Sequence, residues 1–441
     1  MTDWSEVPLE VLLSDKKNAI AMGPFGSRIK AENFVSEGVP VIKGGNLNGA
    51  FLDETDFDFL KEEKAEELKS SKAIAGDIII THRGTIGQVG LIRKNSKYTE
   101  YIVSQSQLKF TPSKSKLDST FAYYFLKSPL GQHRLLMNSS QVGVPAIAKA
   151  TTSVKEILFP HPPLSDQKAI ANILSTLDDK IELNQKMNQT IEDITKAIFK
   201  SWFVDFDPVR AKIESRPTDL PPEISDLFPA EFVNSEIGEI PKGWNIKPLD
   251  QIGNFRNGLA LQKYPAKDGE EHFPVVKIAQ LRKGSTIGDD LFASSVPSDF
   301  LINDGDYIFS WSGSLMAKYW VGGRGALNQH LFKVEEKSHP LWFIAGWVEH
   351  HMPEFQSIAE SKATTMGHIK REHLKQALCA IPHQELIDRA AIEVTPLIKR
   401  SILSQQESKV LYELRDTLLP KLISGELRIT DAEKFLEGVN I

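Results

Sequence analysis

The second half of the chain repeats landmarks of the first half, in the same order. Residues 4–9 (WSEVPL) return as residues 244–249 (WNIKPL), residues 40–43 (PVIK) as 274–277 (PVVK), and residues 76–81 (GDIIIT) as 305–310 (GDYIFS). A glycine soon follows each copy of the last phrase, at Gly84 and Gly313. A single repeat of this length differs from the short periods of solenoid arrays, so the pattern predicts a tandem duplication of one module.

Composition limits the class of protein. With 441 residues, 41% of them apolar and 25% charged, the chain is expected to form roughly two to four globular domains. The single Cys379 excludes an internal disulfide framework and a cysteine-based zinc cluster, and it suits a reducing cytosol. The polar first residues and the lack of a long apolar run predict a cytoplasmic protein with no signal peptide and no membrane helix.

The net charge of −6 argues against a generally basic nucleic-acid binder. Residues 205–241, however, hold nine Asp or Glu against three Lys or Arg, which alone gives 3 − 9 = −6. The two modules are therefore near neutral, and the composition leaves room for a local basic face.

The predicted fold class is α+β, with two mixed α/β domains in tandem. The first domain is assigned to residues 1–163, with β-rich runs at 39–42, 77–81 and 107–111 and a helical pattern near 119–137. The second domain is its copy at residues 244–383. Between a central helix and this copy, residues 205–243 are rich in proline and acid, which is typical of an extended linker. A short tail is expected at residues 426–441.

Each domain is followed by a long helical pattern, at residues 164–204 and 384–425, with Ser165 as the expected N-cap of the first. Their apolar stripes match at an offset of 220 residues and consist of Ile170, Leu174, Leu177, Ile181, Ile191, Ile194 and Ile198 in the first pattern and Ala390, Val394, Leu397, Leu411, Leu414, Leu418 and Leu422 in the second. Helices of this length need a partner, so we predict that the two pair as an antiparallel coiled coil. Both stripes turn polar midway, which fixes register at some cost in stability; Pro396 is expected to kink or delay the second helix.

Several phrases resemble one known family, the DNA specificity subunit of type I restriction–modification systems. They are residues 23–27 (GPFGS), 201–210 (SWFVDFDPVR), 227–229 (LFP), 238–244 (GEIPKGW) and 418–426 (LLPKLISGE). The resemblance covers nearly the whole chain. It implies that the two modules are target recognition domains, each reading one half of a split site in double-stranded DNA. It also implies that the long helices space them and dock two methyltransferase subunits, which restriction and translocase subunits then join.

Residues suited to reading DNA lie in or beside the strand–turn segments. Arg and Lys suit guanine, Asn and Gln suit adenine, and Ser or Thr serve several bases. The candidates are Lys43, Asn46, Thr81, Arg83, Gln88, Gln105 and Gln107 in the first module, and Lys277, Gln280, Ser310, Ser312, Lys318, Tyr319, Gln329 and His330 in the second. Each of them also has an ordinary interpretation as a solvated turn residue or a local cap. Lys43 and Lys277 recur in the same context, which suits a shared phosphate contact.

No catalytic or metal-binding motif is found. The sequence lacks a His-Glu-x-x-His run, a phosphate-binding Gly-x-x-x-x-Gly-Lys-Ser/Thr loop and a Gly-x-Ser-x-Gly turn. We therefore expect a non-catalytic subunit without a cofactor, with S-adenosylmethionine, ATP and Mg²⁺ bound only by partner subunits. Trp202, at the exit of the first helix, suits either a partner's anchor pocket or the protein's own core. The alternative functions are a coiled-coil interaction scaffold that does not bind DNA, and an enzyme whose site has no familiar motif.

Overall fold

The computed structural model describes residues 4–49, 51–140, 143–289, 291–361 and 367–438. The chain divides into two compact units. Unit 1 comprises Met1–Glu182 and Lys409–Ile441, and unit 2 comprises Leu183–Ser408. Each unit therefore holds one α/β domain together with half of each long helix. The part of unit 1 that precedes the first long helix is domain 1, and residues 205–383 of unit 2 form domain 2.

The strands of domain 1 are β1 (Glu6–Pro8), β2 (Ile20–Met22), β3 (Phe34–Val35), β4 (Val39–Ile42), β5 (Asp58–Leu60), β6 (Lys72–Ile74), β7 (Ile78–Thr81), β8 (Val89–Leu91), β9 (Glu100–Val103), β10 (Gln107–Phe110), β11 (Ser139–Ser140), β12 (Ala146–Ile147) and β13 (Leu158–Pro160). Its helices are α1 (Leu9–Leu12), α2 (Glu62–Glu67), α3 (Ser119–Lys127), α4 (Pro129–Leu136) and α5 (Ala150–Lys155). The expected strands at 39–42, 77–81 and 107–111 correspond to β4, β7 and β10.

After a hairpin of β14 (Phe232–Ser235) and β15 (Gly238–Pro241), the strands of domain 2 are β16 (Asn245–Pro248), β17 (Gly253–Asn257), β18 (Phe273–Val276), β19 (Phe292–Ala293), β20 (Leu301–Ile302), β21 (Tyr307–Ser310), β22 (Met316–Tyr319), β23 (Gly325–Leu327), β24 (Leu331–Glu336) and β25 (Leu378–Ile381). Its helices include α9 (Leu249–Ile252), α10 (Ile278–Lys283), α11 (Leu341–Ser361) and α12 (Arg371–Gln376).

Sheet topology shows that the two domains are copies of one design. One sheet has the order β2-β10-β7-β8 in domain 1 and β17-β24-β21-β22 in domain 2. A second sheet is built in both domains around one parallel pair, β4–β9 and β18–β23. In both domains the first strand pairs with the last, β1 with β13 and β16 with β25. The repeat in the sequence is therefore a repeat of the fold, and the predicted α+β class is confirmed.

The helical pattern near 119–137 forms two helices rather than one. Pro129 lacks a backbone N–H and starts α4, while the Ser128 side chain caps it by accepting a hydrogen bond from the Gly131 N–H at 3.1 Å. Asp118 caps α3 by accepting from the backbone N–H groups of Thr120 and Phe121. Together the two caps fix where each helix begins.

The two long helices are α6 (Leu164–Phe199), which continues as a π-helical turn at Lys200–Val204, and α13 (Gln384–Ile423). Ser165 lies inside the first turn of α6 instead of capping it, because the Pro163 carbonyl already accepts from Asp166 and Gln167. Pro396 does not interrupt α13. A short helix, α14 (Ile429–Gly438), follows in unit 1. No helix in the described ranges combines the length and the apolar content that a membrane crossing requires.

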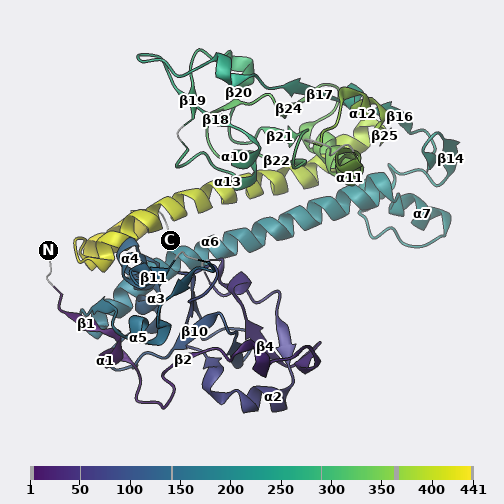
Figure 1. The fold of residues 1–441 in the computed structure, drawn as a ribbon. Helices are drawn as coiled ribbons and strands as arrows, with labels where there is room; N and C mark the ends of the chain where they lie inside the picture. The colour runs from purple at the N-terminus through teal and green to yellow at the C-terminus, as the bar shows by residue number, and fades with distance from the viewer. Residues whose placement is uncertain (1–3, 50, 141–142, 290, 362–366, 439–441) are drawn as a thin grey trace. The chain divides into compact units, whose positions relative to one another are not determined.

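The two long helices pair within each unit (Figure 1). In unit 1 the first half of α6 packs with the second half of α13 in one core cluster. In unit 2 the second half of α6 and the first half of α13 share the core of domain 2. The order of these contacts makes the helices antiparallel, as predicted. The buried members of the predicted stripes are Ile170, Leu174, Leu177, Ile181, Ile191, Ala390, Val394, Leu411, Leu418 and Leu422.

Four predicted stripe positions are less buried than expected. Ile198, Leu397 and Leu414 are only half-buried, and Ile194 is 43% exposed. Trp202 is buried and lies edge-on to Phe228, with ring centroids 5.7 Å apart. Of its two interpretations, the core of domain 2 is therefore the one that the structure supports.

The polar middle of the helix pair lies inside unit 2. Asn184 is buried, and its side chain donates to the Glu407 carboxylate at 2.8 Å. Ser404 and Ser408 are buried as well, and the Ser408 hydroxyl donates to the Ser404 carbonyl. Polar side chains at such positions cost stability but disfavour other registers of the pair.

Residues 205–243 were expected to form an extended linker, and the structure corrects this. They fold into α7 (Asp207–Ile213), α8 (Pro222–Ser225) and the β14–β15 hairpin. Apolar residues between the prolines are buried in the core of domain 2, namely Phe206, Val209, Ile224, Phe228 and Ile240. The proline content reflects helix starts and turns, since Pro208 lies in the first turn of α7 and Pro222 begins α8.

A buried polar network ties domain 1 to both long helices. The Tyr124 hydroxyl on α3 donates to Asp178 on α6 at 2.7 Å, and the Arg415 guanidinium on α13 donates to the other oxygen of Asp178 at 2.6 Å. Burial and the negative charge of Asp178 raise the pKa of Tyr124, so this hydroxyl remains a donor. One carboxylate therefore joins three elements that are far apart in the sequence.

Replacing this carboxylate is expected to destabilise unit 1. Asp178→Ala leaves the buried Tyr124 hydroxyl without its acceptor and Arg415 with only the exposed Asp416. We expect a loss of about 3 kcal/mol in the free energy of unfolding, because breaking a buried charged pair is costly. Hydrogen exchange of the α3 amides in increasing urea measures it. The exposed Asp193→Ala on the same helix should change stability by less than about 0.5 kcal/mol; an equal effect of both substitutions would contradict the role of the network.

Candidate nucleic-acid interface

Three of the predicted DNA-reading residues of domain 1 bond to one another, and of these Thr81 and Gln107 are buried while Gln88 is half-buried. The Thr81 hydroxyl donates to the Gln88 side-chain oxygen at 2.9 Å, and the Gln107 amide donates to the Thr81 hydroxyl at 3.2 Å. Gln88 also donates to the carbonyl of Gly44 and to the side chain of Asn48. These bonds hold the loop after β4 against β7 and β10. Thr81 and Gln107 are fully occupied in the interior and unavailable to base edges.

Lys43 and Asn46 build the turn after β4. Asn46 is buried; its side chain accepts from the Lys43 backbone N–H at 2.9 Å and donates to the carbonyls of Asp53 and Asp56. The Lys43 ammonium forms an ion pair with Asp58. Asn46 is therefore a structural turn residue, and Lys43 reaches a phosphate only by leaving its carboxylate partner.

Domain 2 repeats this turn. The Lys277 backbone N–H donates to the Gln280 side-chain oxygen at 3.2 Å, at the start of α10. The recurrence of Lys43 and Lys277 in the sequence thus reflects a repeated cap at the end of a strand. Sequence context alone cannot distinguish such a cap from a repeated phosphate contact.

Arg83 and Gln105, like Lys43, are predicted residues that lie exposed on the surface of domain 1. Arg83 is exposed on the turn between β7 and β8, and Gln105 is exposed on the turn before β10. His82 joins the two turns, because its ring nitrogen Nε2 bonds to the Gln105 carbonyl at 3.2 Å. Burial, helped by the charge of Arg83, lowers the pKa of His82. At neutral pH the imidazole is then uncharged, and the cationic group of this turn is Arg83.

A depression of about 580 Å³ lies beside the Arg83 turn. Its lining includes Arg83 together with Lys149, Val144, Thr151 and Thr152. In the described part of the chain, neither Arg83 nor Lys149 makes an ion pair. Cations beside threonine hydroxyls have the chemistry that suits phosphate contacts and hydrogen bonds to base edges. No strand–turn pattern in the sequence marks Lys149 as a candidate, because the residue lies far along the chain from the β7–β8 turn.

The same turn is built in domain 2. In domain 1 the Gly84 N–H donates to the Pro145 carbonyl at 2.9 Å, and in domain 2 the Gly313 N–H donates to the Gly367 carbonyl at 2.8 Å. Both glycines have positive φ, +87° and +64°, a backbone conformation that residues other than glycine rarely adopt. In both domains, the turn after the central strand is thus hydrogen-bonded in the same way to a loop that lies much later in the domain.

Around the turn of domain 2, polar and aromatic side chains replace the cations of domain 1. The Ser312 hydroxyl bonds to His330 Nδ1 at 3.0 Å, and Gln329 lies at 3.4 Å from the other ring nitrogen. The Trp311 ring lies 5.8 Å from that imidazole and donates its indole N–H to Asn257. Ser312, Gln329 and His330 are therefore brought together, as a set that differs chemically from Arg83, Gln105 and Lys149.

Ser310, Lys318 and Tyr319 do not join this cluster. The Ser310 hydroxyl is buried and donates to the Ser312 carbonyl. The Lys318 ammonium donates to the Arg282 carbonyl at 3.2 Å, and burial lowers its pKa. Tyr319 packs on Tyr307, with ring centroids 4.9 Å apart. Lys318 and Tyr319 instead line a cavity of unit 2.

Comparison with known proteins gives the class. The family model described as "Type I restriction modification DNA specificity domain" matches residues 25–193 and 241–410. The chain is 29% identical to the type I restriction enzyme MjaIX specificity subunit of Methanocaldococcus jannaschii, over 81% of this chain and 78% of that protein. It is 25% identical to the HindI specificity subunit of Haemophilus influenzae, over 62% and 70% of the two chains.

The fold has also been seen in a crystal structure. The S subunit of the type I restriction–modification system of M. genitalium superposes with a TM-score of 0.59 at 17% identity, covering 95% of this chain and 96% of that one. The family model matches each of the two domains once and covers most of the chain. The protein belongs to the family of type I restriction–modification specificity subunits.

Substituting Gln105, in the turn before β10, and Gln107, the first residue of β10, should distinguish a recognition role from a structural one. Gln107→Leu removes a buried amide and leaves the Thr81 hydroxyl without one of its partners, so we expect unfolding to become easier by about 1–3 kcal/mol. The DNA sequence that the assembled enzyme methylates should stay the same. Gln105→Leu, two residues away and exposed, is expected to keep the stability and to change that sequence. Urea denaturation and sequencing of methylated bases measure both; the reverse pattern would contradict the assignment.

Proposed function

We propose that this chain recognises a DNA site in two parts, one part per domain, and brings methyltransferase and restriction subunits to it. The observation that carries the proposal is the turn that is built in the same way in both domains and surrounded by different side chains in each. A duplicated frame with divergent surface groups suits two readers of two different short sequences. The chain's membership of the specificity-subunit family is the reason to expect DNA as the ligand and methyltransferase and restriction subunits as partners.

The chemistry around each turn suggests what each domain reads. In domain 1, Arg83 and Gln105 have the donor and acceptor geometry for guanine and adenine edges, and Lys149 suits a phosphate. In domain 2, Gln329 suits adenine, and Ser312 and His330 offer single hydrogen bonds. The indole of Trp311 adds an apolar surface. We propose that these residues form the recognition surface of each domain.

Arg83→Ala tests the surface of domain 1. In the enzyme assembled with its methyltransferase subunits, we expect DNA affinity to fall between about fivefold and 150-fold, equivalent to about 1–3 kcal/mol. The specificity should relax at one position in one half of the site only. Methylation sequencing and a binding titration over a range of salt concentrations measure the two effects.

The matched control is Lys94→Ala, which removes an exposed cation elsewhere on domain 1. We expect it to leave the methylated sequence unchanged. If Arg83→Ala leaves affinity, sequence and salt dependence unchanged, this surface does not read DNA. If the unsubstituted assembly binds random duplex without any salt dependence, the chain is a protein scaffold instead.

We propose that the long helices dock two methyltransferase subunits at equivalent positions. Leu183 on α6 and Leu403 on α13 match at the offset of 220 residues, and both are exposed, by 59% and 58%. Ile194 and Ile392 add exposed apolar surface to the same helices within unit 2. Equivalent apolar positions on two similar helices favour two copies of one partner. S-adenosylmethionine, and the ATP and Mg²⁺ of restriction, are then expected in the partner subunits.

Charged substitutions test this docking. Leu183→Asp and Leu403→Asp are each expected to reduce the assembly from two methyltransferase subunits to one, and the double substitution to none. Native mass spectrometry counts the subunits. Ile237→Asp, an exposed apolar residue in the turn of the β14–β15 hairpin, is the control and should retain both. Two subunits on the double variant would disprove the docking positions.

A further inference from the structure

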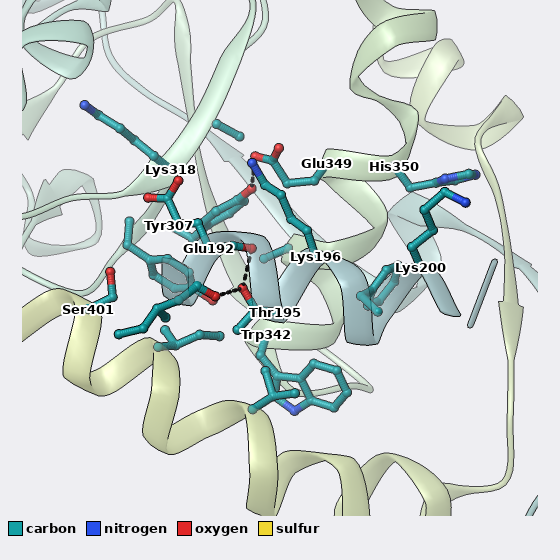
Figure 2. A pocket seen from close by; sticks show the side chains of 18 of the residues that line it. Glu192, Thr195, Lys196, Lys200, Tyr307, Lys318, Trp342, Glu349, His350 and Ser401 are labelled. Atoms are coloured by element: carbon teal, nitrogen blue, oxygen red, sulfur yellow. Dashed lines mark hydrogen bonds between the residues drawn. The ribbon is translucent and has the colours of Figure 1, made fainter. Parts of the chain in front are cut away.

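Unit 2 contains a cavity of about 530 Å³ between domain 2 and its two helix halves (Figure 2). Strands β21 and β22 and helix α11 form one side, and α6 and α13 form the other. A volume of this size is typical of small-molecule sites. Apolar side chains make up much of the wall, including Ile191, Phe199, Val204, Trp342, Val394 and Ile398.

The equivalent place in unit 1 is filled. There, Tyr124, Asp178 and Arg415 join α3 to both long helices through direct hydrogen bonds of 2.7 and 2.6 Å. Asp178 is 2% exposed. The protein's own guanidinium and phenol thus occupy the space between the domain and the helix pair.

Aligning the two copies shows why unit 2 is hollow. Counted from the first residues of α3 and α11, Tyr124 corresponds to Gly346; at the helix offset of 220, Asp178 corresponds to Ile398 and Arg415 to Thr195. Gly346, Ile398 and Thr195 all line the cavity. The phenol, the carboxylate and the guanidinium are replaced by hydrogen, an alkyl group and a short hydroxyl.

A larger residue in place of Gly346 could not fill the cavity without displacing its neighbours. A Cβ at Gly346 would lie 2.3 Å from the ring of Phe199, so α11 approaches α6 as closely as a glycine allows. The cavity extends to the side of this contact. It is therefore a consequence of how α11 packs on α6, combined with small side chains around the contact.

The polar groups of the cavity include two carboxylates without a cation partner. Tyr307 donates to the half-buried Glu349 at 3.1 Å, as Figure 2 shows. Burial raises the pKa of Glu349; the Lys196 ammonium and the Tyr307 hydroxyl lower it in part, while Glu192 raises it further. Among the described residues, neither Glu349 nor Glu192 makes an ion pair.

Two of the three lysines that line the cavity already have partners. Lys318 donates to the Arg282 carbonyl, and Lys200 pairs with Asp205. Lys196 is exposed and attracts Glu349 only from beyond ion-pairing distance. The lining of the cavity thus combines apolar surface with unpaired acids and a tyrosine hydroxyl.

We propose that this cavity binds a small organic cation with an apolar body, of the class of arylalkylamines and alkylguanidines. The body fills the space between Phe199, Ile398 and Trp342, and the cationic head reaches Glu349 and Glu192. Such a ligand supplies from outside the cation that Arg415 supplies in unit 1. When bound, it connects α11 to both helix halves of unit 2, as the Tyr124–Asp178–Arg415 network connects α3 to the helices of unit 1. The proposal does not depend on the DNA-reading surfaces.

Calorimetric titration of the full-length chain tests it, with phenethylamine and agmatine as probes and phenylacetate as the anionic counterpart of the first. We expect at least one of the two cations to bind at one site per chain and to raise the unfolding temperature, and phenylacetate not to bind. If neither cation binds, or if phenylacetate binds as well as phenethylamine, the proposal is overturned.

Two variants locate the binding. Glu349→Gln keeps the size of the side chain and removes its charge, and it should weaken binding at least tenfold, as expected for the loss of a charge-assisted contact. Glu360→Gln, the same change on an exposed residue of α11, should leave binding unchanged. Equal affinity of the Glu349→Gln variant and the unsubstituted chain would overturn the proposal.

The double substitution Thr195→Arg with Ile398→Asp transfers the ion pair of unit 1 into the cavity. It should abolish binding of the cation while circular dichroism and DNA affinity remain those of the parent chain. If the double variant is folded and still binds the cation with the original affinity, the ligand does not occupy this cavity.

Discussion

The structure depends on the antiparallel pairing of α6 and α13. A single helix of this length with one apolar stripe is not stable in water without a partner. Pairing buries Leu174, Leu177 and Leu418 in unit 1, and Ala390 and Val394 in unit 2. Each unit takes half of each helix, so unit 1 is assembled from two separate stretches of chain, whereas unit 2 is the single stretch Leu183–Ser408. The core of unit 1 is completed by the second half of α13, although residues 183–408 separate that segment from the rest of the unit in the sequence.

The two domains share one backbone arrangement but differ in the side chains that pack between each domain and the long helices. The strand order of one four-stranded sheet, the turn after its central strand and the pairing of the first strand with the last are the same in both domains. The contact between each domain and the long helices, in contrast, differs between the two units. In unit 1 a carboxylate shared by Tyr124 and Arg415 fills the contact, whereas unit 2 has a glycine closely packed on Phe199 and a cavity beside it. Two copies of one fold can therefore differ in what they bind at equivalent places.

Polar residues in this fold serve two purposes that look alike in a sequence. Gln107 and Gln105 are two residues apart, but one stabilises the interior and the other reaches the surface. The same holds for Thr81 and Arg83 on either side of His82. Since strand and turn residues alternate between inside and outside over such short distances, the amino-acid type does not reveal which of them can meet DNA. Whether a residue of β7 or β10 or of the adjoining turns can meet DNA depends on whether its side chain is buried in the domain.

The sequence by itself determined the duplication, the α+β class, the two long helices and their mutual pairing, because repeats and apolar stripes are local patterns that can be counted. The sequence also indicated the family, through short motifs such as residues 201–210 and 418–426. Tertiary structure alone decided that residues 205–243 fold onto domain 2 and that Trp202 belongs to its core. It also decided that Asn46, Thr81 and Gln107 are structural, and that Lys149 lies beside Arg83. Each of these depends on contacts between residues distant in the chain, and no local pattern records them.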